Sequence, residues 1–211
     1  MSLDTEMGCA MAGRGRPRTF DRAEALGSAM RVFWEHGYEG AAMADLTRAM
    51  GINSPSLYAA FGSKEELFRE AVALYEQTEG AAAMTALSTG ATAREAIAGA
   101  LRANACAYTE PDNPRGCMIV LAATTYTDRS AALRDHLADR RRGMERLFQD
   151  RVERGMAEGD VPPGTDAVRV AAFYNAVMQG MSVQARDGAA RATLLAVADR
   201  ALAAWDVVAA G

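Results

Sequence analysis

A short stretch between residues 54 and 64 gathers side chains that can bind phosphates and base edges. Ser54 and Ser56 fall at the expected start of a short helix, where free backbone N–H groups and the helix dipole favour an anion. Tyr58 adds a third hydroxyl on the same helix, and Lys64 supplies a cation at the start of the next one. A lysine there binds phosphate through its charge, whereas hydroxyls can also reach base edges. The chemistry predicted for this stretch is contact with DNA.

A second basic segment lies near the N-terminus, at Arg14, Arg16 and Arg18. Residues 13–22 have a net charge of +3, whereas residues 13–70 carry eight basic and eight acidic side chains. The full chain has a net charge of −4, so attraction to phosphate must come from this arm and Lys64 rather than from a global field. The Arg-Gly-Arg-Pro-Arg order suits insertion into an A·T-rich minor groove. The alternative is a solvated tail that only aids solubility.

Two short helices must position these groups. We expect one helix at about 43–50, a tight turn at Gly51, and a second helix that Ser54 caps. Leu57 and Phe61 are four residues apart, so both should face inward and hold the second helix on a core. This arrangement predicts a helix-turn-helix whose second helix lies in the major groove.

Flanking helices complete the unit. A helix that Asp21 caps should run to a stop at Gly37, and Ser63 with Glu66 forms a capping box that opens a helix reaching about residue 79. The alanines at 41–42 offer no hydroxyl, so the helix that follows them should lack a side-chain cap.

The remaining chain is also predicted to be helical, with no strand. Alanine is abundant and isoleucine occurs only at positions 52, 97 and 119, which favours helix over sheet. Half of the residues are hydrophobic, enough for a sizeable core. We expect an all-α fold in which a three-helix unit is followed by a larger region of about six helices. The later helices should lie at about 92–108, 116–126, 128–158, 166–186 and 189–208. Thr92 with Glu95 forms a capping box for the first of these, and Asp128 caps the helix that reaches Glu158.

The sequence lacks the patterns of an enzyme, a cofactor site or a membrane protein. His36 and His136 have no metal-ligand spacing around them, and no P-loop, G-x-S-x-G or Cys-x-x-Cys motif occurs. Three widely spaced cysteines make no disulfide framework and favour a reducing cytosol. Residues 1–12 do not form a signal peptide, and no long apolar run predicts a membrane span. We predict no catalytic residue, cofactor or metal.

Residues 19–79 resemble the N-terminal domain of the TetR family of bacterial transcriptional regulators. The residues that carry the resemblance, in the family's order and spacing, are Phe33, Gly37-Tyr38, Leu46, Met50-Gly51-Ile52, Ser56-Leu57-Tyr58, Phe61 and Ser63-Lys64-Glu65-Glu66-Leu67. The resemblance implies a helix-turn-helix at about 42–61, a homodimer and a palindromic double-stranded DNA operator. We expect a repressor in the cytoplasm at the nucleoid, because a dimer that covers a promoter blocks the polymerase without further contacts; an activator is the alternative. By position, it assigns DNA contacts to Ser54, Pro55, Ser56, Tyr58 and Lys64.

Two departures from the family pattern weaken direct base contact. Ala59 and Ala60 follow Tyr58 where larger or polar residues are common, and the alanines at 41–42 replace a usual Thr/Ser pair. We therefore expect the arm of Arg14, Arg16 and Arg18, within a disordered segment at 1–18, to contribute more.

Residues 80–211 would form a ligand-sensing and dimerisation domain. The segment Asn113–Val120 resembles the helix that links the ligand cavity to the DNA-binding domain in one group of TetR-like regulators. The helices at 166–186 and 189–208 would form the dimer interface. Each candidate for the pocket of a small apolar effector could also be an ordinary core residue. The candidates are Cys106, Tyr108, Cys117, Met118, Met144, Phe148, Phe173 and Met178.

Two alternative functions stay open. Some relatives sense oxidants or electrophiles through a cysteine at the location of Cys117, and Arg115 or a helix N-terminus could lower the pKa of its thiol. Inert packing is the other interpretation of Cys117. A helical module that binds protein instead of DNA is the second alternative function, and salt-dependent DNA binding would distinguish it from a regulator.

Overall fold

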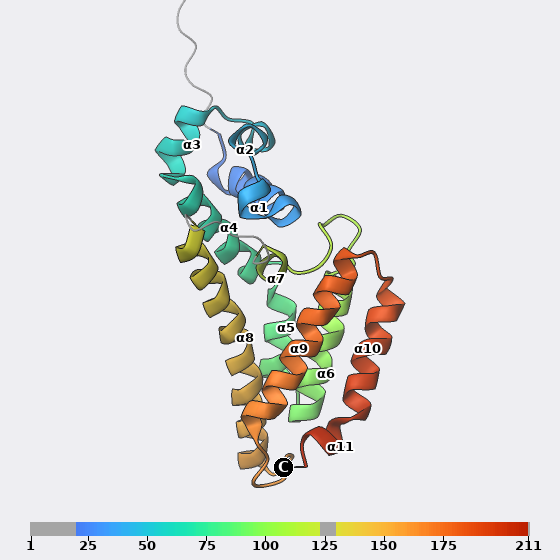
Figure 1. The fold of residues 1–211 in the computed structure, drawn as a ribbon. Helices are drawn as coiled ribbons and strands as arrows, with labels where there is room; N and C mark the ends of the chain where they lie inside the picture. The colour runs from blue at the N-terminus through green and yellow to red at the C-terminus, as the bar shows by residue number, and fades with distance from the viewer. Residues whose placement is uncertain (1–19, 123–129, 211) are drawn as a thin grey trace, which may run out of the picture.

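The computed structural model describes residues 20–122 and 130–210. These residues form eleven helices and no strand, which confirms the predicted all-α fold (Figure 1). The N-terminal helices lie at one end of the molecule and the long C-terminal helices at the other, with α4 and the short α7 between them (Figure 1). The basic arm and the expected cap at Asp128 lie outside the described residues. The helices are α1 (Arg22–Gly40), α2 (Met43–Met50), α3 (Ser54–Phe61), α4 (Lys64–Gln77), α5 (Ala81–Thr89), α6 (Ala93–Ala107), α7 (Met118–Leu121), α8 (Ala131–Glu158), α9 (Ala167–Arg186), α10 (Arg191–Ala203) and α11 (Trp205–Val208).

The first two helices begin where the sequence predicts, and α2 also ends there, but α1 continues past the predicted stop at Gly37 to Gly40. The Asp21 side chain accepts hydrogen bonds from the backbone N–H groups of Ala23 and Glu24, at 2.8 and 3.1 Å. Gly37 has a φ of 69°, which residues with side chains rarely adopt, so α1 is interrupted there. The α2 helix has no side-chain cap and ends at Gly51 in the left-handed conformation. These local signals set the geometry of the turn before α3.

The cap of α3 differs from the prediction. Asn53, not Ser54, is the N-cap: its side-chain oxygen accepts a hydrogen bond of 2.9 Å from the Ser56 N–H, while Ser54 is already the first helical residue. Asparagine is at least as good a cap as serine, so the helix begins one residue earlier than a cap at Ser54 would place it. The predicted cap of α4 is confirmed, since the Ser63 hydroxyl accepts from the Glu66 N–H at 3.1 Å.

An aromatic core holds the N-terminal helices on α4. The rings of Phe33 and Phe68 meet edge to face with centroids 5.0 Å apart, and those of Trp34 and Tyr75 do so at 4.8 Å. All four side chains are buried, and the same core continues into α7 through Met118 and into the start of α8. Large buried rings of this kind contribute strongly to the stability of a core.

The C-terminal half contains one helix that the sequence did not predict. The Ala- and Thr-rich segment of α5 has no side-chain cap, yet it forms a helix because Ala83 and Leu87 are buried in the core of this half. The next helix, α6, begins as predicted, where the Thr92 hydroxyl accepts from the Glu95 N–H at 3.2 Å. Tertiary packing, rather than a local signal, creates α5.

The last predicted helix is divided in two. The chain leaves α10 at Ala203 and starts α11 at Trp205, although no glycine or proline marks a break. The Trp205 ring is buried with its centroid 5.8 Å from that of Tyr174 on α9. Burying this ring turns the chain across the end of the bundle, so the break has a tertiary cause.

The α7 helix covers only Met118–Leu121 of the predicted 116–126, and residues 123–129 lie outside the described residues. The long α8 ends as expected at Gly159, which adopts the left-handed conformation. Among the described helices, none is long and apolar enough to cross a membrane.

Candidate nucleic-acid interface and internal cavity

The α3 helix is anchored on one side and open on the other. Leu57 is fully buried and Phe61 is 3% exposed, which confirms that both face inward. Tyr58, between them in sequence, is 49% exposed, and Ser54 and Pro55 are exposed as well. Ser56 is half-buried, and its N–H donates to the Asn53 cap. The hydroxyl-bearing start of α3 therefore points to solvent from a fixed base.

Arg22 braces α3 from the side, a role that sequence reasoning missed. Its guanidinium donates to the backbone oxygen of Ala60 at 3.3 and 3.2 Å, pairs with Glu70 at 2.8 Å and lies 4.3 Å from the Phe61 ring centroid. These contacts join the start of α1 to the end of α3 and to α4. The partners are 38 and 48 residues away, so no local pattern could reveal them.

Lys64 is held at the start of α4 beside α1. Its ammonium nitrogen lies 4.5 Å from the centroid of the Tyr38 ring, a cation–π contact. Burial lowers the pKa of Lys64 from its ordinary value, and the nearby Glu39 carboxylate partly opposes this effect. Tyr38 thus positions a cation at the start of α4, three residues beyond the end of α3.

A cavity of about 980 Å³ opens among α4, α5, α6, α7, α8 and α9. Four of the eight predicted pocket residues line it: Tyr108, Cys117, Met144 and Met178. The other four lie elsewhere because of their positions on the helices. Met118 and Phe148 are fully buried in the two hydrophobic cores, Cys106 is exposed, and Phe173 is 38% exposed on the outer side of α9.

Polar side chains in the cavity wall were missed by the sequence analysis. Asn104 and Asn175 are 6% and 4% exposed, and Tyr75 contributes a buried phenol from α4. A signal was present, since Asn175 occurs at a core position of α9 between the buried Tyr174 and Met178. A search restricted to apolar and sulfur-bearing residues could not find it.

Comparison with known proteins identifies the family. The model described as "Bacterial regulatory proteins, tetR family" matches residues 25–71, and "Tetracyclin repressor-like, C-terminal domain" matches residues 95–202. The HTH-type transcriptional repressor ComR of Escherichia coli (strain K12) is 37% identical over 198 residues, 93% of this chain and 94% of ComR. The chain belongs to the TetR family.

Other relatives agree with this assignment. The HTH-type transcriptional repressor BdcR of Escherichia coli (strain K12) is 30% identical over 174 residues, 82% of this chain and 83% of BdcR. A solved structure of the TetR family regulator CifR, a cysteine mutant complexed with 26-base-pair operator DNA, is 52% identical. It covers 90% of this chain and 100% of its own, with a TM-score of 0.87. The chain is therefore a DNA-binding transcriptional regulator, and its family is one of regulators rather than enzymes.

Cys117 in this TetR family member does not have the environment of a reactive thiolate. Burial raises the pKa of its thiol, and hydrogen bonds with Tyr75 and Tyr108 and with nearby backbone only partly oppose this effect. The expectation that Arg115 lowers this pKa is wrong. The Arg115 guanidinium turns to the end of α9, where it donates to the backbone oxygen of Ala185 at 2.8 Å and to that of Ala189. The neutral thiol predominates in this wall.

The loop between α6 and α7 connects the cavity wall to α1. The backbone oxygen of Gly116 accepts a buried hydrogen bond of 3.1 Å from the Trp34 indole, and the next residue, Cys117, lines the cavity. The Cys117 N–H donates to the Ser182 hydroxyl of α9 at 2.8 Å. A displacement of the cavity wall at Cys117 would therefore move the backbone of Gly116, to which Trp34 of α1 is hydrogen-bonded.

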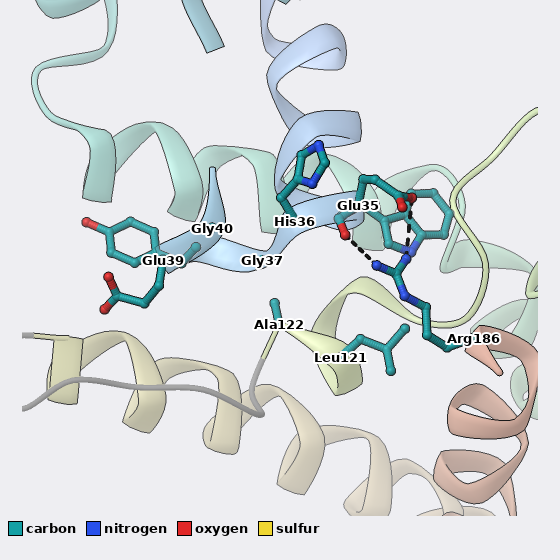
Figure 2. A pocket seen from close by; sticks show the side chains of 10 residues that line it. Glu35, His36, Gly37, Glu39, Gly40, Leu121, Ala122 and Arg186 are labelled. Carbon is teal, nitrogen blue, oxygen red and sulfur yellow. Dashed lines mark hydrogen bonds and ion pairs between the residues drawn. The ribbon is translucent and has the colours of Figure 1, made fainter. Parts of the chain in front are cut away.

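A smaller hollow of about 370 Å³ marks the same seam (Figure 2). Arg186, at the end of α9, reaches across it, donates to the backbone oxygen of Glu35 and pairs with the Glu35 carboxylate at 3.3 Å (Figure 2). The interrupted end of α1 from Gly37 to Gly40 lines the hollow, opposite Leu121 and Ala122. The last turn of α9 is thus tied to the helix that supports α3.

Proposed function

We propose that the protein is a repressor that binds a palindromic operator as a homodimer and is released from it by a small molecule. The observation that carries this proposal is the 49% exposure of Tyr58 on a helix that Leu57 and Phe61 fix to the core. Such a helix can enter a major groove without rearranging its base. Residues 19–79 would form the DNA-binding domain and residues 80–211 the sensing and dimerisation domain, acting in the cytoplasm at the nucleoid.

The proposed DNA contacts come from α3, the start of α4 and the N-terminal arm. Hydroxyls at the α3 start and the Lys64 cation would bind phosphates, and Tyr58 would reach deepest into the groove. Arg22 would keep the end of α3 in register through its bonds to Ala60 and Glu70. The complete set is Arg14, Arg16, Arg18, Ser54, Pro55, Ser56, Tyr58 and Lys64.

The proposed dimer interface is formed by α9 and α10. The outer face of α9 exposes apolar side chains along most of its length, including Val168, Ala172, Phe173, Ala176 and Val183. A contiguous apolar face of this kind marks an interaction surface on a soluble helix bundle. Self-association through it about a two-fold axis would present two α3 helices to one duplex, as a palindromic operator requires.

The proposed effector site is the cavity bounded by α4 to α9. The cavity wall includes Tyr75 on the helix that leaves the DNA-binding unit and Cys117 beside the Gly116–Trp34 bond. A ligand that favours one arrangement of this wall shifts the operator-binding population by its differential affinity. A thiol sensor at Cys117 receives no support from its raised pKa.

The first test is selection of genomic DNA fragments by the wild-type protein, followed by affinity measurements on the selected operator. Tyr58→Ala should weaken operator binding at least about tenfold, since a good groove contact contributes about 1–3 kcal/mol. It should leave the unfolding temperature unchanged because the side chain is half exposed. The wild-type affinity should fall by several powers of ten per tenfold rise in salt.

The matched control is Arg154→Ala, which removes an exposed cation on α8 that pairs with Glu158. This variant should bind the operator like the wild type. Failure to select any fragment, or salt-independent binding, would favour the protein-interaction alternative.

A further inference from the structure

The deep wall of the cavity offers hydrogen bonds without charge. Tyr75 and Tyr108 are each 3% exposed, and burial raises the pKa of both phenols well above 10.0, so they are neutral at physiological pH. The pKa of the Cys117 thiol is raised for the same reason. An ionic group placed against this wall would lose its water and gain no opposite charge.

Asn104 carries the most informative polar group in this wall. The residue is 6% exposed and lines the cavity, yet its side-chain amide makes no hydrogen bond with any residue that the structure describes. Its amide atoms are not among the fully enclosed, unpaired atoms of the described residues, so they are open to the cavity, where a ligand or solvent can reach them. Asn175 differs because its amide nitrogen already donates to the Glu145 carboxylate at 2.9 Å. The free donor and acceptor of Asn104 are available to a ligand.

The charged side chains that line the cavity are exposed or paired with other groups of the protein. Asp139, Arg140, Arg146 and Asp150 line it from α8, and all four are exposed. Arg140 is 3.5 Å from Glu76. Arg141, which is half-buried, donates to the backbone oxygen of Ile119 at 3.1 Å. These groups are solvated or paired, so they provide no counter-charge at the buried end.

We propose that the effector is an uncharged amphipathic molecule whose hydroxyl or amide head pairs with Asn104. Its apolar body packs against Met84, Met144 and Met178, whose flexible thioether side chains line the cavity and adapt to varied shapes. The volume of about 980 Å³ is at the upper end of the range for small-molecule sites, so an extended hydrocarbon or aromatic body fits. The inference rests on the proposed function, because it requires this cavity to be the effector site.

The test uses nine compounds and the full-length protein. Phenylbutyl, cyclohexylbutyl and octyl bodies each carry a hydroxyl, a methyl ether or a carboxylate head, and calorimetry gives the dissociation constants. On each body the alcohol should bind about tenfold tighter than the ether, which lacks the donor, and tighter than the carboxylate, which brings a charge. Absence of binding by all nine compounds, or tightest binding by the carboxylates, overturns the proposed class.

Asn104→Leu separates a recognition role from a structural one. The variant should reduce the alcohol-to-ether preference from about tenfold to below about twofold. Without ligand, its unfolding temperature should equal or exceed that of the wild type, because leucine is similar in size and the amide that it replaces makes no hydrogen bond within the described protein. A purely structural Asn104 would instead lower the unfolding temperature and leave the preference intact, which overturns the assignment.

The control variant is Gln149→Leu, which removes an amide on α8 that bonds to Glu153 outside the cavity. It should keep the tenfold preference. Operator affinity of the ligand-free protein is measured in parallel. A protein that binds its operator but prefers carboxylates overturns this inference alone, whereas one that binds no operator overturns the proposed regulator.

Discussion

The interiors of the two halves of the molecule differ in the polarity of their buried side chains. In the described part of α1 to α4, every buried side chain is apolar or aromatic. The buried polar residues all lie in the C-terminal half: Asn104, Ser130, Arg151, Thr165, Asn175 and Ser182. The buried side-chain atoms without a hydrogen-bond partner, in the part of the chain described, belong to His136, Arg151, Asp160 and Asn175 of that same half.

The difference separates a rigid unit from a responsive one. Interlocked rings such as Phe33 with Phe68 and Trp34 with Tyr75 leave the N-terminal half few alternative packings, which suits a unit that must present α3 in one orientation. Incompletely paired polar groups carry a free-energy cost that a ligand or a shift of helices can relieve. We expect the helices of the C-terminal half to rearrange on effector binding and the N-terminal half to move with them as a rigid body.

Removing the buried charge of Arg151 should have the largest effect on this contrast. Its side chain is 2% exposed, and its guanidinium lies 3.5 Å from the Asp160 carboxylate and 3.3 Å from the backbone oxygen of Gly90. The same Asp160 carboxylate accepts from the Ala93 N–H at 2.8 Å at the start of α6. Arg151→Ala leaves Asp160 without its buried partner and should lower the free energy of unfolding by about 3–5 kcal/mol, measured in urea.

Arg154→Ala is the matched control on the same helix. Arg154 pairs with Glu158 at 3.5 Å, but it is 42% exposed, so its loss should cost less than about 1 kcal/mol. Equal losses for the two variants would show that burial of charge does not distinguish this half.

The seam between the halves should be intermediate in sensitivity. Trp34→Phe keeps most of the ring that packs on Tyr75 but removes the buried donor to the Gly116 oxygen. The free energy of unfolding should fall by about 1–3 kcal/mol, because a buried carbonyl loses its partner. Arg31→Ala removes a bond to the Asp112 oxygen of the same loop at an exposed site, and thermal unfolding should detect a change below about 0.5 kcal/mol. A larger loss of unfolding free energy for Arg31→Ala than for Trp34→Phe would show that the exposed hydrogen bond, and not the buried one, contributes most to the contact between the two halves.

Local chemistry was predictable from the sequence, and tertiary consequences were not. The caps at Asp21, Ser63 and Thr92 and the inward turn of Leu57 and Phe61 each depend on residues within four positions, so they could be predicted. The all-helical fold followed from the same kind of signal.

The features that escaped prediction depend on distant partners. The brace from Arg22 to Ala60, the burial of α5 and the break before Trp205 are fixed by elements far away in sequence. Half of the predicted pocket residues line the cavity. An apolar residue on an amphipathic helix can face either the core or the pocket, and the neighbouring helices that decide between the two are not specified by the local sequence. Asn104 could have been suspected as a polar residue on a buried helix face.

A smaller effect than that of Trp34→Phe is expected at the cap of α3, where sequence and structure disagree. Asn53→Ala removes the acceptor for the Ser56 N–H and should cost about 1 kcal/mol of unfolding free energy. Ser54→Ala should change stability by only a few tenths of a kcal/mol, because its exposed hydroxyl caps nothing, yet it should weaken operator binding. Thermal unfolding and operator affinity, measured on both variants, separate the two roles. A stability loss for Ser54→Ala as large as that for Asn53→Ala would show that Ser54 is the cap after all. The α3 helix would then start one residue later, and its first turn would be held less firmly.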